Sequence, residues 1–247
     1  MFIAASTHCL SDLSFADACE QIAEMEYDRI EIWMDENSDH LKPSFVAEDP
    51  ERFITQYRDI TRLTPVAFSV NHDIDLATLT ELAKTAKLMR FTQITVPASP
   101  LGTPFNTEID RLRSFVQATS IEGIQVSIKT EIGHLTEDPH TAVELCQSVK
   151  GLGLTLDPSH YICGPHANKS HDMVYPYVHH VQLRDTSPKE LQVQIGLGEV
   201  DYNRLISMLE AQHYNLALSV ELLPEKLDKS QRPLEMRKMR MLLDSLL

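Results

Sequence analysis

Several features that define other classes of protein are scarce or missing in this chain of 247 residues. Its four cysteines are scattered without a C-x-x-C pair, which indicates reduced thiols rather than a disulfide framework. No apolar stretch approaches the length of a membrane span, and the first residues, MFIAAST, lack the charged and apolar regions of a signal peptide. We therefore expect a soluble, cytoplasmic protein with no membrane partner.

Basic side chains are also scarce, because 22 lysines and arginines face 36 acidic residues and give a formal charge of −14. An acidic surface repels the phosphates of nucleic acids, and the one segment rich in basic residues, RPLEMRKMR, is typical of a solvated helix face. The composition therefore disfavours nonspecific binding to nucleic acid. No glycine-rich loop is present to hold a phosphate, which favours an unphosphorylated ligand.

Short apolar strands alternate with amphipathic helices along the whole chain, without a shift in composition that would mark a domain boundary. Strands are expected at 1–7, 29–34, 65–70, 93–97, 124–131, 152–157, 178–183 and 216–221. Helices are expected at 14–25, 48–61, 76–89, 107–119, 139–149, 202–211 and 230–246, with Ser14 capping the first. This alternation predicts a single (β/α)8 barrel that spans residues 1–247.

Four strands in the second half of the chain end in a side chain that can bind a metal ion. They are Glu131, Asp157, Gln182 and Glu221. An apolar strand has no structural use for a carboxylate at its tip, because burying an unpaired charge is costly. Three carboxylates and one amide oxygen in series indicate a hard divalent cation held by oxygen atoms.

The position of these residues at strand ends favours a closed barrel over a doubly wound open sheet. In a (β/α)8 barrel the carboxyl ends of all strands surround one mouth, which holds the active site. An open sheet would not bring the ends of four successive strands around one point. The two longest loops, 35–48 and 185–198, are expected to overhang the mouth.

Five segments then give the chain a family resemblance: TEIGHLTEDP, GLTLDPSHY, HHVQLRDT, GLGEVDY and LSVELL. In this order they resemble the xylose-isomerase-like barrel superfamily, which includes the AP endonuclease family 2 proteins. Its members are sugar and sugar-phosphate isomerases and epimerases, inosose-type dehydratases and the endonuclease IV group. The resemblance covers most of the chain and implies an enzyme that depends on a divalent metal.

The resemblance implies that Glu131, Asp157 and Glu221 are metal ligands. The fourth ligand of the family is usually a histidine in a pattern like H-V-H-L-K-D, but this chain reads H-V-Q-L-R-D and has Gln182 there. Some hydroxypyruvate isomerases and 3-dehydroshikimate dehydratases look similar in this respect. Because an amide oxygen is a harder donor than imidazole, we expect Mn²⁺ or Mg²⁺ in preference to Zn²⁺. His180 is expected to face outward or sideways and to pack or support the site.

Further side chains are expected to contact the substrate. The resemblance implies that His160, three residues after the second ligand, lies beside the substrate and polarises one of its oxygens. Arg184 is either a surface ion-pair partner or a cation that fixes the far end of the substrate. His8 and His72 end the first and third strands, so each is either a substrate contact or structural. Relatives contact substrate or a neighbouring loop at the position of Glu199.

A divalent metal at such a site can chelate a carbonyl and its adjacent hydroxyl and stabilise the enediolate formed on deprotonation. By resemblance to the epimerases, Glu131 and Glu221 are expected to be acid and base as well as ligands. The first hypothesis is therefore an isomerase or epimerase of a small sugar or hydroxy-keto compound.

Three other hypotheses remain. The same site would act as a dehydratase on an inosose-like or 3-dehydroshikimate-like ring. An endonuclease IV type of DNA-repair enzyme is disfavoured, because the extra histidines and the Asp-x-His pair of that group are missing and the charge is −14. A non-catalytic binding protein is disfavoured by the three strand-end carboxylates. The resemblance is compatible with a homo-oligomer, which the residues neither require nor exclude.

Overall fold

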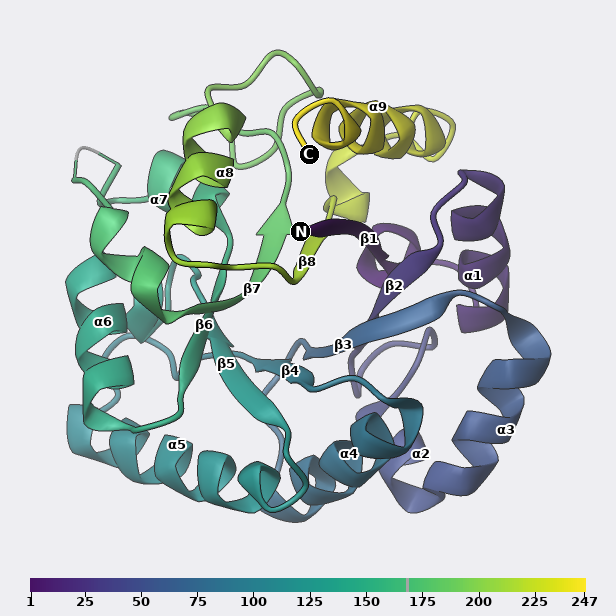
Figure 1. The fold of residues 1–247 in the computed structure, drawn as a ribbon, viewed down its shortest axis with the longest axis horizontal. Coiled ribbons are helices and arrows are strands. Elements are labelled where there is room, and N and C mark those ends of the chain that lie inside the picture. The colour runs from purple at the N-terminus through teal and green to yellow at the C-terminus, as the bar shows by residue number, and fades with distance from the viewer. Residues whose placement is uncertain (168) are drawn as a thin grey trace.

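The computed structural model describes residues 1–167 and 169–247. Parallel strands close into a barrel in the order of the chain, and helices surround it (Figure 1). The strands are β1 (Phe2–Ser6), β2 (Arg29–Met34), β3 (Thr64–Val70), β4 (Gln93–Val96), β5 (Gln125–Lys129), β6 (Gly153–Leu156), β7 (Val178–Leu183) and β8 (Ala217–Val220). The prediction of a (β/α)8 barrel is confirmed.

The helices follow the strands and cover the outside of the barrel. They are α1 (Phe15–Glu24), α2 (Pro43–Glu48), α3 (Pro50–Ile60), α4 (Leu76–Met89), α5 (Phe105–Ser120), α6 (Pro139–Ser148), α7 (Pro158–Cys163), α8 (Tyr202–Ala211) and α9 (Arg232–Asp244). Short 3-10 helices occur at η1 (Thr7–Leu10), η2 (Leu135–Glu137), η3 (Asp172–Tyr177) and η4 (Pro224–Lys226). Within the described residues, no helix is both long enough and apolar enough to cross a membrane.

The barrel closes where the first strand meets the last. Ala5 of β1 is in register with Ile30 of β2 on one side and with Val220 of β8 on the other. Because every strand runs parallel to its neighbours, all carboxyl ends lie at the same rim. Residues that follow the strands are thereby brought together even when they lie far apart in the sequence.

The two faces of the strands differ in polarity. In β2, the alternate residues Ile30, Ile32 and Met34 are buried on the apolar side, toward the helices. The interior of the barrel is polar instead. Thr95 of β4 and Thr155 of β6 are not on neighbouring strands, and their hydroxyl oxygens lie 2.7 Å apart across the interior. The barrel thus has its apolar core outside the strands and a hydrogen-bonded polar layer inside them.

Two short helices were not predicted, and a proline opens each of them. Pro43 is at the first position of α2, within the stretch predicted as a long loop. Pro158 is at the first position of α7, in a segment for which no helix was expected. Proline suits this position because its fixed φ matches the helix and its missing N–H would have had no partner there. The predicted cap of α1 is confirmed, since Ser14 accepts a hydrogen bond from the backbone N–H of Asp17.

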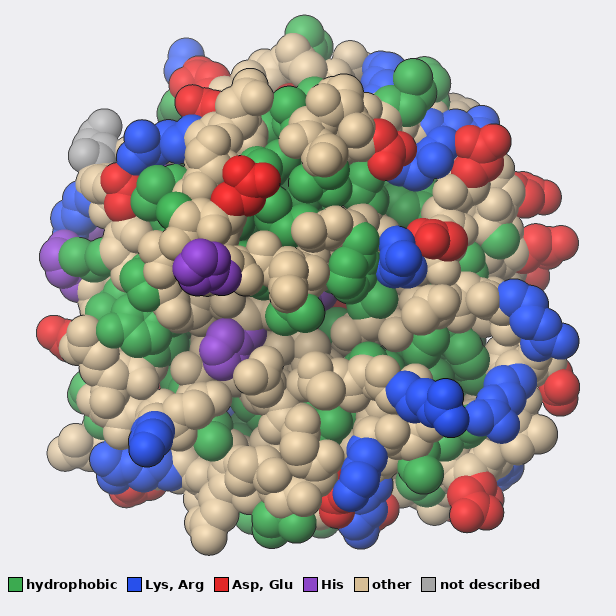
Figure 2. All heavy atoms as spheres, in the orientation of Figure 1, with side chains coloured by type: hydrophobic (Ala, Val, Ile, Leu, Met, Phe, Trp, Pro, Cys, Tyr) green, Lys and Arg blue, Asp and Glu red, His purple; other side chains and the backbone are tan. Residues whose placement is uncertain are grey.

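Charged side chains are mixed on the molecular surface. On the face drawn in Figure 2, lysines and arginines alternate with aspartates and glutamates around the rim rather than forming a basic patch. This distribution agrees with the absence of basic runs in the sequence.

Candidate active site

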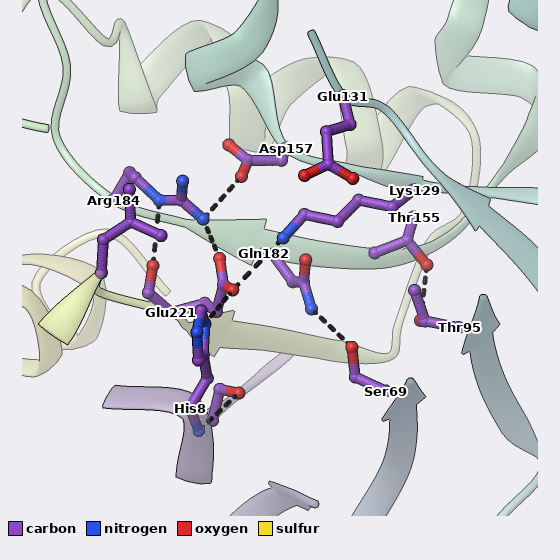
Figure 3. Close-up of polar contacts among 12 residues, drawn as sticks. His8, Ser69, Thr95, Lys129, Glu131, Thr155, Asp157, Gln182, Arg184 and Glu221 are labelled. Carbon is purple, nitrogen blue, oxygen red and sulfur yellow. Dashed lines mark hydrogen bonds and ion pairs between the residues drawn. The ribbon is translucent and has the colours of Figure 1, made fainter. Parts of the chain in front are cut away.

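Four side chains predicted as metal ligands project from the carboxyl ends of β5 to β8 toward one region of the barrel mouth (Figure 3). Three of them, Asp157, Gln182 and Glu221, have at most 1% of their surface exposed. Glu131 differs, because 32% of its side chain is exposed. The ends of the strands therefore meet as predicted, but only one of the carboxylates faces solvent.

Asp157 is held by the start of helix α7. Its Oδ1 accepts hydrogen bonds from the backbone N–H of Ser159 at 3.0 Å and from the hydroxyl of that residue at 2.5 Å. Helix α7 then returns His160 one turn later, with Nε2 3.5 Å from Asp157 Oδ2. His160 Nδ1 accepts from the backbone N–H of Ile132 at 3.1 Å, so the ring proton lies on Nε2, toward Asp157.

His160 is 5% exposed and both of its ring nitrogens have partners within the protein. Burial lowers the pKa of His160 to about 4, against the opposing effect of Asp157, so the ring is neutral at pH 7. His160 therefore supports Asp157. Its position beside the substrate, which the resemblance implies, stays a prediction.

Arg184 joins two of the carboxylates. Its Nη2 lies 2.8 Å from Asp157 Oδ2 and contacts Glu221 Oε2, and its Nε donates to the backbone carbonyl of Glu221 at 3.0 Å. The contact with Asp157 lacks the alignment of a hydrogen bond, so its attraction is ionic. Burial alone would raise the pKa of Asp157, but the charge of Arg184 lowers it, helped by His160 and Lys129. Arg184 is fully buried and is neither a surface residue nor an open substrate contact.

Glu221 has two further partners on its other oxygen. Lys129 Nζ lies 3.2 Å from Oε1, and His8 Nδ1 lies 2.7 Å from the same atom. Burial, with the charges of Lys129 and Arg184, lowers the pKa of His8 to about 3, so a neutral ring donates to Glu221. His8 also stacks on Trp33, with ring centroids 4.5 Å apart. In this structure, the partner of His8 is therefore a protein carboxylate.

Gln182 is bound deeper in the barrel. Its Nε2 donates to Glu31 Oε1 at 2.9 Å and to Ser69 Oγ at 3.3 Å. Because Glu31 accepts, the amide oxygen must turn the other way, and Figure 3 shows it on the side of Lys129. In the described part of the chain, this buried oxygen has no hydrogen-bond partner. His180 is 1% exposed and pairs with Glu31, so it lies inside the barrel and supports Gln182; the expectation that it faces outward or sideways was wrong.

Glu131 remains the accessible carboxylate of the site. Its nearest charged partner is His134, whose Nδ1 lies 3.7 Å from Oε2. His134 also lines a cavity of about 260 Å³ at the ends of β3 and β4, together with His72. His72 is 56% exposed and its Nδ1 lies 3.0 Å from Asp35 Oδ1. The cavity is smaller than those that hold drug-sized ligands, and Glu131 itself does not line it.

The loop after β7 is organised by Asp185. Its carboxylate accepts hydrogen bonds from the backbone N–H groups of Thr186, Gly196 and Gly198, at 3.1, 2.8 and 3.0 Å. This explains the glycines of the GLGEV segment: Gly196 has φ of +92°, and a Cβ on Gly198 would overlap the carboxylate. Glu199 is exposed at the end of this loop, and its backbone N–H donates a hydrogen bond to the carbonyl oxygen of Thr186.

The sequence did not lead us to predict Lys129 and Glu31 as residues of the site. Lys129 precedes Glu131 by two residues, and Glu31 lies within the predicted strand RIEIWM. Because side chains alternate along a strand, a charged residue two positions from an inward-facing one also faces inward. That alternation was the available signal for Lys129.

The predicted ligand set does not fit a divalent cation in this arrangement. Mg²⁺ binds oxygen at about 2.0–2.1 Å, so an ion on Asp157 and Glu221 would occupy the gap between their oxygens. Nη2 of Arg184 lies in that gap. Across residues 1–167 and 169–247, no group of three His, Cys, Asp or Glu side chains is placed to hold a metal. The expected Mn²⁺, Mg²⁺ or Zn²⁺ therefore stays a prediction from the resemblance.

Fold and geometry together define a (β/α)8 barrel with a charged site at the carboxyl ends of its strands. The chain belongs to the xylose isomerase-like TIM barrel family, whose model matches residues 19–244. No curated protein sequence matches the chain.

Solved structures agree on the fold at low identity. A xylose isomerase-like TIM barrel protein from Mycobacterium smegmatis in complex with magnesium has a TM-score of 0.76 at 17% identity, over 99% of this chain and 97% of that one. A D-tagatose 3-epimerase-like protein has a TM-score of 0.75 at 17% identity, over 100% of this chain and 98% of that one. The probable 3-DHS dehydratase AsbF from Bacillus anthracis has a TM-score of 0.73 at 16% identity, over 98% of this chain and 99% of that one. Proteins of this fold thus include epimerase-like proteins, a probable dehydratase and a magnesium complex.

Proposed function

We propose that this protein is an isomerase of a small, unphosphorylated sugar or hydroxy-keto compound, acting by proton transfer next to a carbonyl group. The observation that carries the proposal is that an accessible carboxylate, Glu131, and a partly buried lysine, Lys129, lie together at the barrel mouth. Burial, helped by the charge of Arg184, lowers the pKa of Lys129, and the charge of Glu131 opposes this lowering. Figure 3 shows the side chains of Lys129 and Glu131 projecting into the same region.

Glu131 is the base in this proposal. It takes the proton from the carbon that carries the substrate hydroxyl, and the electrons of that C–H bond form the double bond of an enediolate. The former carbonyl oxygen becomes negative and is paired with Lys129. The hydroxyl proton then moves to that oxygen, the new carbonyl forms, and Glu131 returns its proton to the neighbouring carbon. Atoms and charge balance without a further reactant.

The surroundings of Glu221 favour isomerisation over epimerisation. An epimerase needs an acid or base on each face of the enediolate, and Glu221 was expected to serve the second face. Glu221 is 1% exposed and bound by Arg184, Lys129 and His8, so its oxygens are occupied. A proton shift on one face needs only Glu131.

Dehydration is the second candidate. If the substrate carries a hydroxyl group β to the carbanion, the same intermediate loses it as water once that group is protonated. His134, 3.7 Å from Glu131, supplies an imidazole at this place. The two candidates differ in product, because elimination gives a conjugated enone that absorbs in the ultraviolet.

The test is deuterium uptake from D₂O, followed by proton NMR, with ketoses, hydroxypyruvate, an inosose and 3-dehydroshikimate as substrates. We expect wild type to exchange the proton next to the carbonyl of one of them and to form its isomer. Glu131→Gln should lower that rate by at least about 100-fold, the usual contribution of a general base.

A matched control is Glu144→Gln, which makes the same change on an exposed position of α6. It should keep the wild-type rate. Exchange that persists in Glu131→Gln would reject Glu131 as the base, and exchange with none of these carbonyl compounds would reject the substrate class.

A further inference from the structure

Two basic side chains of this site, Lys129 and Arg184, each lie two residues from a predicted metal ligand. Lys129 lies two residues before Glu131 on β5, and Arg184 lies two residues after Gln182 at the end of β7. Side chains two apart on a strand share a face, so both cations are directed at the carboxylates. Their position is built into the strands and does not depend on a loop.

The cations also leave little freedom for the carboxylates. Arg184 is fully buried, and its Nε is fixed by the backbone carbonyl of Glu221 at 3.0 Å while Nη2 joins the two carboxylates. Lys129 is 16% exposed and lies 3.2 Å from the remaining oxygen of Glu221. To admit a metal ion, the site would have to break a buried guanidinium–carboxylate pair, which is costly in a medium of low polarity.

The charges lead to the same conclusion. Three acidic side chains, Glu131, Asp157 and Glu221, share this site with two basic ones, and Lys129 Nζ and Arg184 Nη2 both contact Glu221. The protein itself therefore places two basic groups against the carboxylates that a divalent ion would bind. A divalent cation at this place would be repelled at close range by Lys129 and Arg184.

We propose that Lys129 and Arg184 replace the divalent metal ion in this member of the family, so that the site works without a metal. Lys129 faces the substrate oxygen that becomes negative, and Arg184 joins Asp157 and Glu221 at the place where a metal ion would bind them. This inference rests on the proposed proton transfer for its chemical meaning, but its metal-binding part stands on the geometry alone.

The first measurement is the metal content of the wild-type protein. The protein is purified, dialysed against excess Mn²⁺, passed through a desalting column and measured by elemental mass spectrometry; thermal unfolding is then followed with Mn²⁺, Mg²⁺ or Zn²⁺ added. We expect far less than one ion per chain and no rise in Tm with any of the three. One tightly held ion per chain would overturn the proposal, whatever the substrate proves to be.

The second measurement is a gain of binding. Lys129→Met/Arg184→Met removes both cations with side chains of similar length and leaves three uncompensated carboxylates next to Gln182. We expect this variant to bind Mn²⁺ at least about tenfold more tightly than wild type, by calorimetric titration, because the repulsion is gone and the carboxylates need a cation. The control Lys87→Met/Arg204→Met removes two exposed, ion-paired cations outside the mouth and should bind no better than wild type.

The metal content of wild type and the Mn²⁺ affinity of the double variant test different parts of the proposal. A double variant that folds but gains no affinity for Mn²⁺ would show that the cations do not occupy a metal position. If the double variant does not fold, the wild-type metal content still decides the proposal. For the substrate found by deuterium exchange, activity should be the same with and without EDTA; loss of activity in EDTA, restored by Mn²⁺, would overturn metal independence while leaving the proton transfer intact.

Discussion

Replacing Arg184 by methionine should destabilise the fold strongly. The change leaves Asp157 and Glu221, exposed by 0% and 1%, without the guanidinium that joins them. Breaking a buried ion pair by removing one partner costs about 3–5 kcal/mol. For a chain of this length, each kcal/mol lowers Tm by about 2–4 °C, so the expected loss is roughly 6–20 °C.

Arg204 provides a matched comparison. Its Nη2 lies 2.7 Å from Asp172 Oδ2, close to the distance in the buried pair, but the two side chains are 58% and 42% exposed. Exposed pairs contribute little to stability because solvent screens them, so Arg204→Met should lower Tm by no more than about 4 °C. Arg184→Met and Arg204→Met are the same chemical change at similar N–O distances. We expect the loss of stability to be several-fold larger for Arg184→Met, because its ion pair is buried.

Urea unfolding followed by circular dichroism at pH 7 measures both free energies, and calorimetry gives both Tm values. The difference between the variants should shrink as the pH is lowered toward 4.5, because Asp157 and Glu221 in Arg184→Met can then take up protons and lose their charge. The reasoning is refuted if Arg184→Met costs no more than Arg204→Met at pH 7. It is also refuted if the cost of Arg184→Met does not change with pH.

Two further predictions concern histidines and the loop after β7. The pKa values of His160 and His8, about 4 and about 3, lie below the value of about 6.5 of the unfolded chain, so the unfolded chain binds protons first as the pH falls. Stability should therefore be complete above pH 6.5 and decline below it, with His160 alone costing on the order of 3 kcal/mol by pH 4; a urea midpoint that stays flat from pH 7 to 4.5 would contradict this. Gly198→Ala should cost about 1–3 kcal/mol, because its Cβ overlaps the Asp185 carboxylate and the loop must shift; a crystal structure with the loop unmoved and an unchanged Tm would count against the account.

The fold followed from the sequence because its signal is repeated along the chain. Strands β2 and β7 and helices α4 and α8 have the predicted bounds, and the other predicted elements differ by a few residues at their ends. Each such element has its own apolar periodicity, which does not depend on distant parts of the chain. The short helices α2 and α7 lack that periodicity, because six residues make fewer than two turns.

The site was only partly predictable. The strand-end positions of Asp157 and Glu221 brought them to the mouth as expected, because parallel strands of a closed barrel share one rim. Their partners were not predictable from spacing, since the reach of Arg184 across to both carboxylates depends on the distance between β6, β7 and β8 in three dimensions. A residue can be assigned a direction from the sequence, but its partner is set by the packing of the whole barrel.

The contact between His8 and Glu221 joins residues 213 positions apart and sits where β1 meets β8. During synthesis on the ribosome, the amino-terminal strand must therefore wait for almost the entire chain before its outer edge is paired. Until then the charged groups of the mouth have no closed barrel to hold them, and the free edge of β1 is open to other strands. The appearance of the assembled site would accordingly report that folding is complete, which makes it a late marker for chaperone or pulse-labelling experiments on this protein.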